Sequence, residues 1–127
     1  MQEKHLYEYA ILRVVPRVER EEFMNVGVVL LCARQRFLKV LYRLDEQRLL
    51  ALCPQLDIAE LQTYLQAFER ICAGAPGSGT IGKFTIAERF RWLTATRSTV
   101  LQSSKVHPGF CSQPELMLER LFAQQVL

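Results

Sequence analysis

Continuous and alternating runs of apolar residues predict three β-strands in the first third of the chain. Residues 6–15 and 26–33 are mostly apolar on both faces, which is typical of strands in the interior of a sheet. Residues 37–43 alternate between apolar and polar side chains, as a strand with one dry and one mainly solvated face does. A polar turn at residues 34–36 separates the last two runs, so they are predicted to form a hairpin.

Apolar residues then recur at helical spacing. Asp45 is placed to cap a short helix over residues 46–52, which Pro54 would stop. Asp57 followed by Glu60 resembles a capping box at the start of a second helix. Its apolar stripe, which we expect to lie against the sheet, consists of Ile58, Leu61, Leu65, Phe68 and Cys72.

The last third of the chain predicts two further helices and an edge strand. Thr85 and Glu88 form a second capping-box pattern before a short helix, whose inward residues would be Ile86, Phe90 and Leu93. Residues 98–103 alternate as an edge strand does. A turn is predicted at residues 108–109, which are Pro-Gly.

The final helix is predicted to begin at Ser112, with Glu115 in its first turn. Its inward-facing residues would be Met117, Leu118, Leu121 and Phe122. Together these elements predict an α+β single domain over residues 1–127, with a mainly antiparallel sheet of three to four strands and helices packed on one face.

Asn25 and Gly27 bracket the start of the second strand. An Asn and a Gly in these positions favour a β-bulge or a turn with positive φ, where two backbones approach closely. We interpret this feature as structural.

Composition narrows the function classes. The four cysteines form no CxxC or CxxH pair, so we predict neither a metal site nor disulfides, and we expect no cofactor. Charged residues interrupt the N-terminal apolar segment, and no apolar run approaches the roughly 20 residues that span a bilayer. We therefore expect a cytoplasmic protein that does not bind membranes.

The excess positive charge lies in one segment. Residues 1–82 hold ten Lys/Arg and ten Asp/Glu, whereas residues 83–111 hold five Lys/Arg and one Glu; residues 112–127 contribute one Arg and two Glu, which gives the net charge of +3. A local concentration of charge attracts an anionic ligand or partner. The same segment also contains the only tryptophan, Trp92.

Arg97, Ser98 and Thr99 are candidates for an anion clamp, because a guanidinium and two hydroxyls all donate to phosphate or carboxylate oxygens. In the alternative interpretation, Arg97 caps helix carbonyls and its neighbours are ordinary strand residues. Trp92 and Arg89 would share one flank of the third helix, where Trp92 either stacks on a base or an aromatic side chain or packs in the core.

His107 and Cys111 are the candidate base and nucleophile of an enzyme. They are four residues apart across the predicted Pro-Gly turn, which would bring them close together. No obvious carboxylate orients His107, so catalysis would lack its third group. The sequence assigns no catalytic residue on this basis.

Two long segments carry a family resemblance: YEYAILRVVPRVEREEFMNVGVVLLC near the start and RFRWLTATRSTVLQSSKVHPGFC later. They resemble the bacterial domain of unknown function 3037 family, over nearly the whole chain. The resemblance implies a fold and no assigned activity. It also implies a protein partner, a kinase-like protein similar to the HipA toxins. The sequence departs from the family pattern at Arg91, Thr96 and Lys105, where His, Pro and Pro are expected.

We therefore predict a non-catalytic binding or accessory module that docks on a protein partner, with a HipA-like kinase as the implied one, through a cationic surface over residues 89–107. The predicted partner- or anion-binding residues are Arg89, Trp92, Arg97, Ser98, Thr99, Lys105 and His107. One alternative is a nucleic-acid-binding protein, although about four phosphate contacts are fewer than the 6–10 of tight binders. The other alternative is a small enzyme that uses Arg97, His107 and Cys111.

Overall fold

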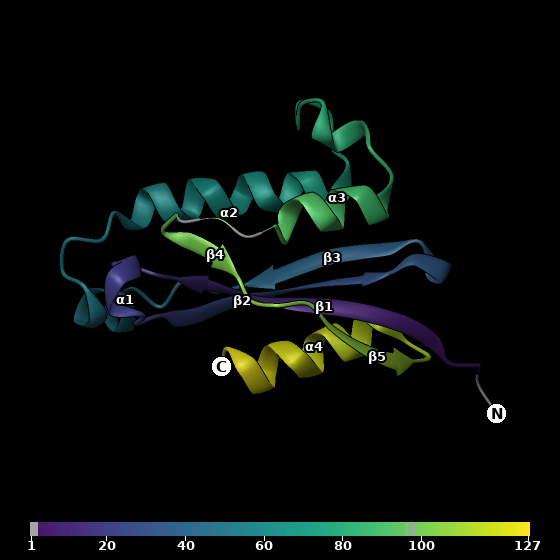
Figure 1. Cartoon of the computed structure of the whole chain (residues 1–127), viewed down its shortest axis with the longest axis horizontal. Helices are drawn as coiled ribbons and strands as arrows, with labels where there is room; N and C mark the ends of the chain where they lie inside the picture. Colours follow the sequence, from purple (N-terminus) through teal and green to yellow (C-terminus); the bar gives the residue numbers. More distant parts are fainter. Residues whose placement is uncertain (1–2, 96, 98) are drawn as a thin grey trace.

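Two hydrophobic strands, β1 (His5–Val14) and β2 (Met24–Cys32), form the centre of an antiparallel sheet. β3 (Phe37–Tyr42) pairs with β2 at one edge. β4 (Leu101–Ser103) and β5 (His107–Cys111) share the other edge, where each pairs with a different half of β1. The computed structural model describes residues 3–95, 97 and 99–127 (Figure 1).

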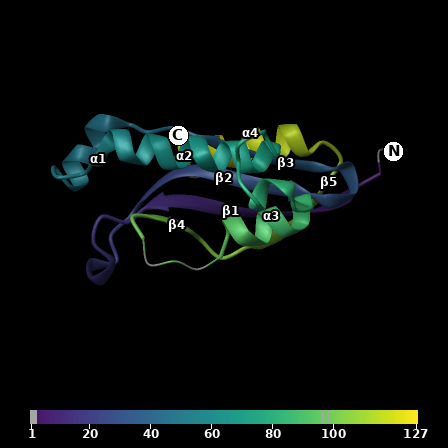
Figure 2. The ribbon, with the colours of Figure 1, turned by 90° about the horizontal axis from the view of Figure 1, so that it is seen from above.

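Helices cover both faces of this sheet. α1 (Glu46–Leu52), α2 (Ile58–Ala73) and α3 (Ile86–Leu93) belong to one side, and α4 (Pro114–Gln125) packs on the opposite side (Figures 1 and 2). The predicted α+β class and antiparallel sheet are confirmed. The prediction that the helices lie on one face is wrong for α4. Because β1 and β2 are apolar on both faces, each face requires a cover.

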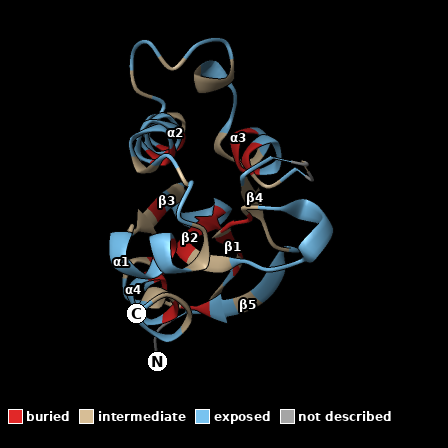
Figure 3. Cartoon of the chain, turned by 90° about the vertical axis from the view of Figure 1, so that its left-hand side faces the viewer, coloured by how far each residue is buried: buried red, intermediate tan, exposed pale blue. Residues whose placement is uncertain are grey.

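Two apolar cores result from the alternation of side chains along the central strands. The core under α2 and α3 takes Ala10, Leu12 and Val14 from β1, whereas the core under α4 takes Tyr7 from the other face of the same strand. Figure 3 colours the buried residues red; they lie along the central strands and on parts of α2 and α3. Successive residues of a strand point to opposite faces, so one strand supplies both cores.

A β-bulge interrupts the pairing of β1 with β2, as the sequence predicts. Leu12 pairs with Gly27 and Arg13 pairs with Asn25, so Val26 is the extra residue. A Cβ atom at position 27 would lie 2.9 Å from the Leu41 carbonyl oxygen, which shows how closely the β2 and β3 backbones approach there. The bulge shifts the alternation, so that Val26 and Val29 point into the same core.

The N-cap residues of the helices can be compared with the predicted caps. The Asp45 and Asp57 side chains accept hydrogen bonds from backbone N–H groups three residues later, and Thr85 with Glu88 forms a full capping box. The prediction that Ser112 caps the last helix is wrong. The N-cap residue is Gln113, which makes no side-chain cap, and α4 begins with Pro114, whose fixed φ suits the first helical position.

Three 3₁₀ turns complete the chain: Val18–Arg20, Ala33–Gln35 and Ile81–Lys83. Within the residues described, no helix is both long enough and apolar enough to cross a membrane.

Candidate functional site

An open groove lies between α2, the end of α3 and the residues at the start of β4. Its volume is about 590 Å³. The floor and walls are mainly apolar and are formed by Ala67, Phe68 and Ile71 of α2, Leu93 of α3, and Leu101 of β4. We call this hollow the α2–β4 groove.

Three large side chains at this groove are substantially exposed. Tyr64 is 47% exposed, Trp92 is 41% exposed and Val100 is 37% exposed. They come from α2, from α3 and from the residue before β4, so the tertiary fold alone brings them together. The prediction for Trp92 left a surface role and a core role open, and the structure places it at the groove with part of its ring in solvent.

Arg97 lies over the indole ring of Trp92. Its guanidinium carbon is 4.3 Å from the ring centroid, and its Nη2 donates a hydrogen bond of 2.6 Å to the Trp92 carbonyl oxygen. This contact agrees with the capping interpretation, because Trp92 is in the last turn of α3. Two ion pairs exist among the described residues, and neither includes Arg97. A guanidinium has five N–H donors, so Arg97 retains donors that a ligand could use.

Thr99 lies just before β4 and is engaged with residues of that strand. Its hydroxyl donates to the Leu101 carbonyl oxygen at 2.7 Å, and the Gln102 side chain donates to the Thr99 carbonyl oxygen at 2.8 Å. Both bonds satisfy backbone groups near the start of an edge strand. Ser98 lies outside the described residues. Of the predicted anion clamp, Arg97 is therefore the described residue with donors to spare.

Arg89 is a correction to the predicted surface. It is 9% exposed, and its Nη1 donates to the carbonyl oxygens of Ile71 and Cys72 at 2.8 and 3.0 Å. These carbonyls are in the last turn of α2, where intrahelical partners run out. Arg89 therefore joins the end of α2 to α3 and does not form part of an exposed surface.

His107 belongs to a different surface from Arg97. His107 is in β5, where its ring lies 5.3 Å from that of Tyr9, which packs with the core under α4. Trp92 and Arg97 lie beside α2 on the opposite side of the sheet. Lys105 is exposed in the link between β4 and β5. The structure therefore does not bring the predicted residues of segment 89–107 into one cationic surface, because the sheet separates His107 from Arg97.

The His107–Cys111 pair is too far apart for direct proton transfer. The predicted turn at Pro108 and Gly109 is wrong, because both residues are inside β5 and pair with β1. Four residues of extended strand place the two Cα atoms about 13 Å apart. Cys111 is buried, and burial, followed by the neighbouring Cys32, raises the pKa of its thiol. Neither the distance between the two residues nor the raised pKa of the thiol suits a nucleophile and its base.

Alkylation should distinguish the buried Cys72 from the partly exposed Cys53. Burial raises the pKa of Cys72 to about 12 from an ordinary value of 9. Its thiolate fraction at pH 8 is then about a thousandfold lower than at the ordinary pKa, so alkylation of the folded protein should leave Cys72 unmodified. In the unfolded chain this thiol ionises first, so the free energy of unfolding should fall between pH 9 and pH 12.

Mass spectrometry after alkylation with iodoacetamide at pH 8 would measure this protection. Cys53, which is partly exposed, provides the comparison within the same chain. Rapid modification of Cys72 under native conditions would contradict its burial, while modification only after denaturation would agree with it.

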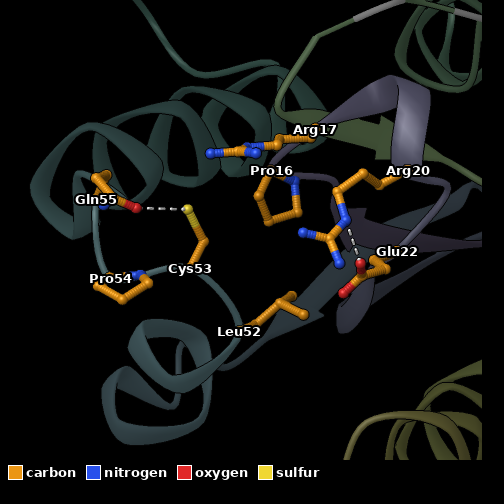
Figure 4. A pocket seen from close by; sticks show the side chains of 8 residues that line it. All are labelled: Pro16, Arg17, Arg20, Glu22, Leu52, Cys53, Pro54 and Gln55. Carbon is orange, nitrogen blue, oxygen red and sulfur yellow. Dashed lines mark hydrogen bonds and ion pairs between the residues drawn. The ribbon is translucent and has the colours of Figure 1, made fainter.

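A second hollow lies next to the groove, at the end of α1. It has a volume of about 150 Å³ and contains Arg17, Arg20 and Cys53 (Figure 4). Its polar groups are partly engaged: Arg20 Nε lies 2.6 Å from a Glu22 oxygen, and the Cys53 sulfur lies 3.5 Å from Gln55 Oε1. Because these side chains bind each other, we assign no binding or catalytic role of its own to this hollow.

A third hollow connects the two regions. It shares Arg17 and Cys53 with the hollow of Figure 4, and it shares Tyr64 and Val100 with the α2–β4 groove. The groove therefore continues along α2 past Glu60, whose carboxylate accepts the Tyr64 hydroxyl hydrogen bond. In the described ranges 3–95, 97 and 99–127, no group of three His, Cys, Asp or Glu side chains converges to hold a metal ion.

Sequence reasoning missed the α2 side of this site. Phe68 packs in the core under α2 and α3, as predicted, and also lines the groove. Tyr64 was not singled out, because a tyrosine beside an apolar helical stripe carries no signal of a groove. Val100 was expected only as part of an edge strand. Which residues of α2 remain uncovered depends on where α3 and β4 pack, and no local pattern encodes that packing.

Comparison with known proteins gives one match. A family model described as "Protein of unknown function (DUF3037)" matches residues 9–126. No curated protein and no solved structure matches the chain.

Proposed function

Because the chain belongs to the DUF3037 family, whose description assigns no activity, we propose a function from the geometry: it is a non-catalytic binding module that docks on a protein partner through the α2–β4 groove. The observation that carries this proposal is the exposure of Tyr64, Trp92 and Val100 around one apolar hollow. Apolar side chains from separate elements that remain exposed together mark an interaction surface more often than scattered ones do.

The residue types at the groove support a protein partner. Trp, Tyr and Arg are the residues that most often dominate the binding energy of protein interfaces, especially in pockets that a partner desolvates. Trp92 and Arg97 are already stacked on each other, so less side-chain entropy is lost when a partner covers them. The arrangement is therefore partly organised for binding before a partner arrives.

The charge of Arg97 indicates which kind of partner segment fits the α2–β4 groove. Arg97 presents a cation at the rim of an apolar hollow, without an ion-pair partner among the residues described. A partner segment with an apolar side chain for the hollow and a carboxylate beside it would satisfy both features. The family resemblance points to a kinase-like protein similar to the HipA toxins as the protein that would supply this segment.

The two alternatives receive less support. Nucleic-acid binding would need several free cations on one surface, whereas Arg89 is buried and His107 lies beside Tyr9 on the side of the sheet opposite Arg97. The enzyme alternative would need His107 beside Cys111, and they are separated along an extended strand.

A charge placed inside the groove should disrupt docking. Val100→Asp is expected to raise the dissociation constant of the complex with the purified kinase-like protein at least about tenfold, because the new carboxylate would be buried against apolar surface. Isothermal titration calorimetry measures this constant. Leu116→Asp is the matched control, since Leu116 is 56% exposed on α4, on the other side of the sheet.

Two results would contradict the proposal. One is equal weakening by Val100→Asp and Leu116→Asp, which would locate the interface elsewhere or reflect a general effect of added negative charge. The other is the absence of heat and of complex formation with the kinase-like protein at about 100 μM of each component, which is about a hundredfold above a micromolar dissociation constant.

A further inference from the structure

We propose that the chain forms a homodimer through an apolar patch at the N-terminal end of β1, a surface distinct from the α2–β4 groove. The centre of this patch consists of Leu6 and Phe110, and the residues around it include Leu31 and Ala33. We call it the β1–β5 patch. It borders a hollow of about 410 Å³.

Leu6 and Phe110 lie side by side on adjacent strands. They are direct partners in the register of β1 with β5, so their side chains point to the same face. Leu6 is 49% exposed and Phe110 is 67% exposed, the highest value of any large hydrophobic side chain in the described ranges. An isolated exposed apolar residue needs no explanation, but a register-matched pair of them forms a patch.

The helices stop short of this end of the sheet. Leu6 has the same parity along β1 as Ala10 and Leu12, which contact the core under α2 and α3. Figure 1 shows the N-terminal end of β1 and the end of β5 extending beyond those two helices. The same sheet face that is covered in its middle is therefore uncovered at this end.

The charges around the patch favour a second copy of the chain as its occupant. Lys4 and Arg34 are cationic, Glu3 and Glu8 are anionic, and all four line the same hollow. No ion pair joins any of them within the described part of the chain. A patch with balanced charges is complementary to itself when a twofold axis brings Glu8 of one copy to Arg34 of the other.

Two copies should meet face to face rather than edge to edge. β5 is an edge strand, and Pro108 within it has no backbone N–H to donate to an added strand. Extension of the sheet by pairing β5 with β5 would therefore lose hydrogen bonds. Packing of the Leu6 and Phe110 side chains across the axis involves no such loss.

The small size of the patch predicts a weak dimer. Nine residues line it, whereas stable interfaces use about 20–30 residues on each side. We expect a dissociation constant on the order of 100 μM. Sedimentation equilibrium of the full chain at concentrations up to about 1 mM would measure it.

Phe110→Asp is expected to weaken the dimer at least tenfold, and so is Leu6→Lys, which provides a second test if one variant folds poorly. Leu116→Asp, with a similarly exposed position on α4, should leave the dimer unchanged. A wild-type chain that stays monomeric over the whole range would overturn the proposal, and so would equal weakening by the control.

Charge reversal tests the twofold arrangement. Glu8→Arg and Arg34→Glu should each weaken the dimer, because each change places like charges together twice across the axis. The double variant should restore it, since both pairs are then reversed together. A double variant that dimerises no better than the single ones would overturn the proposed arrangement.

Discussion

Replacing Arg89 with alanine is expected to lower the free energy of unfolding by about 3 kcal/mol, because the change leaves the buried Cys72 carbonyl and the part-buried Ile71 carbonyl without their charged donor. Arg89 Nη1 donates to Ile71 and Cys72 in the last turn of α2, and the side chain is almost fully buried between α2 and α3. Hydrogen bonds from a charged group are stronger than neutral ones, and the truncation also removes packing contacts of the side-chain stem.

Urea denaturation followed by circular dichroism would measure this loss. Arg91→Ala is the matched control, because Arg91 is exposed on the same helix, and its effect should stay within about 0.5 kcal/mol. Arg89→Lys should recover only part of the stability, since an ammonium lacks the planar set of donors. An Arg89→Ala variant as stable as Arg91→Ala would show that the carbonyls find other partners.

Gly27→Ala is expected to destabilise the fold by about 2 kcal/mol through crowding in the centre of the sheet. The added Cβ would lie 2.9 Å from the Leu41 carbonyl oxygen and 3.1 Å from Tyr42 Cβ. The first of these atoms is backbone in β3, so relief would require movement of the strand. A gain of about 0.4–1 kcal/mol from the lower entropy of the unfolded chain would oppose this cost, and the crowding term should be larger.

Gly79→Ala separates crowding from backbone strain. Gly79 has φ +78°, and a Cβ there would meet nothing within 4 Å. The loss of stability in Gly79→Ala should therefore come from the positive φ alone and amount to about 1 kcal/mol. The same denaturation experiment compares the two variants. A Gly27→Ala protein as stable as the wild type would show that β2 and β3 can separate without cost.

Local signals predicted most of the secondary structure. The Thr85 and Glu88 pattern marked the start of α3, and the apolar run at residues 26–33 marked β2, because caps and strand burial depend on residues close in sequence. Asn25 and Gly27 also indicated the bulge correctly. The Pro108–Gly109 turn was wrong, because pairing with β1 outweighed the turn preference of that dipeptide.

The candidate site was predicted only in part. Trp92 and Arg97 are close in sequence and do lie together, as a stacked pair at the groove. Tyr64 and Val100 complete the groove from positions 36 residues apart. Helical spacing placed Arg89 on the same flank of α3 as Trp92. It could not show that Arg89 binds the end of α2.

The sequence by itself determined the first three strands, the caps of the first three helices, the bulge and the local concentration of positive charge. The tertiary structure decided which of those charges share a surface: it buried Arg89 at the end of α2, left Arg97 at a groove and placed His107 beside Tyr9. The physical reason is that caps and periodicity depend on neighbours along the chain, whereas the exposure of a side chain depends on which distant element packs against it. In this protein Arg97 and the ring of His107 lie on opposite sides of the sheet, so residues close in number face different surroundings.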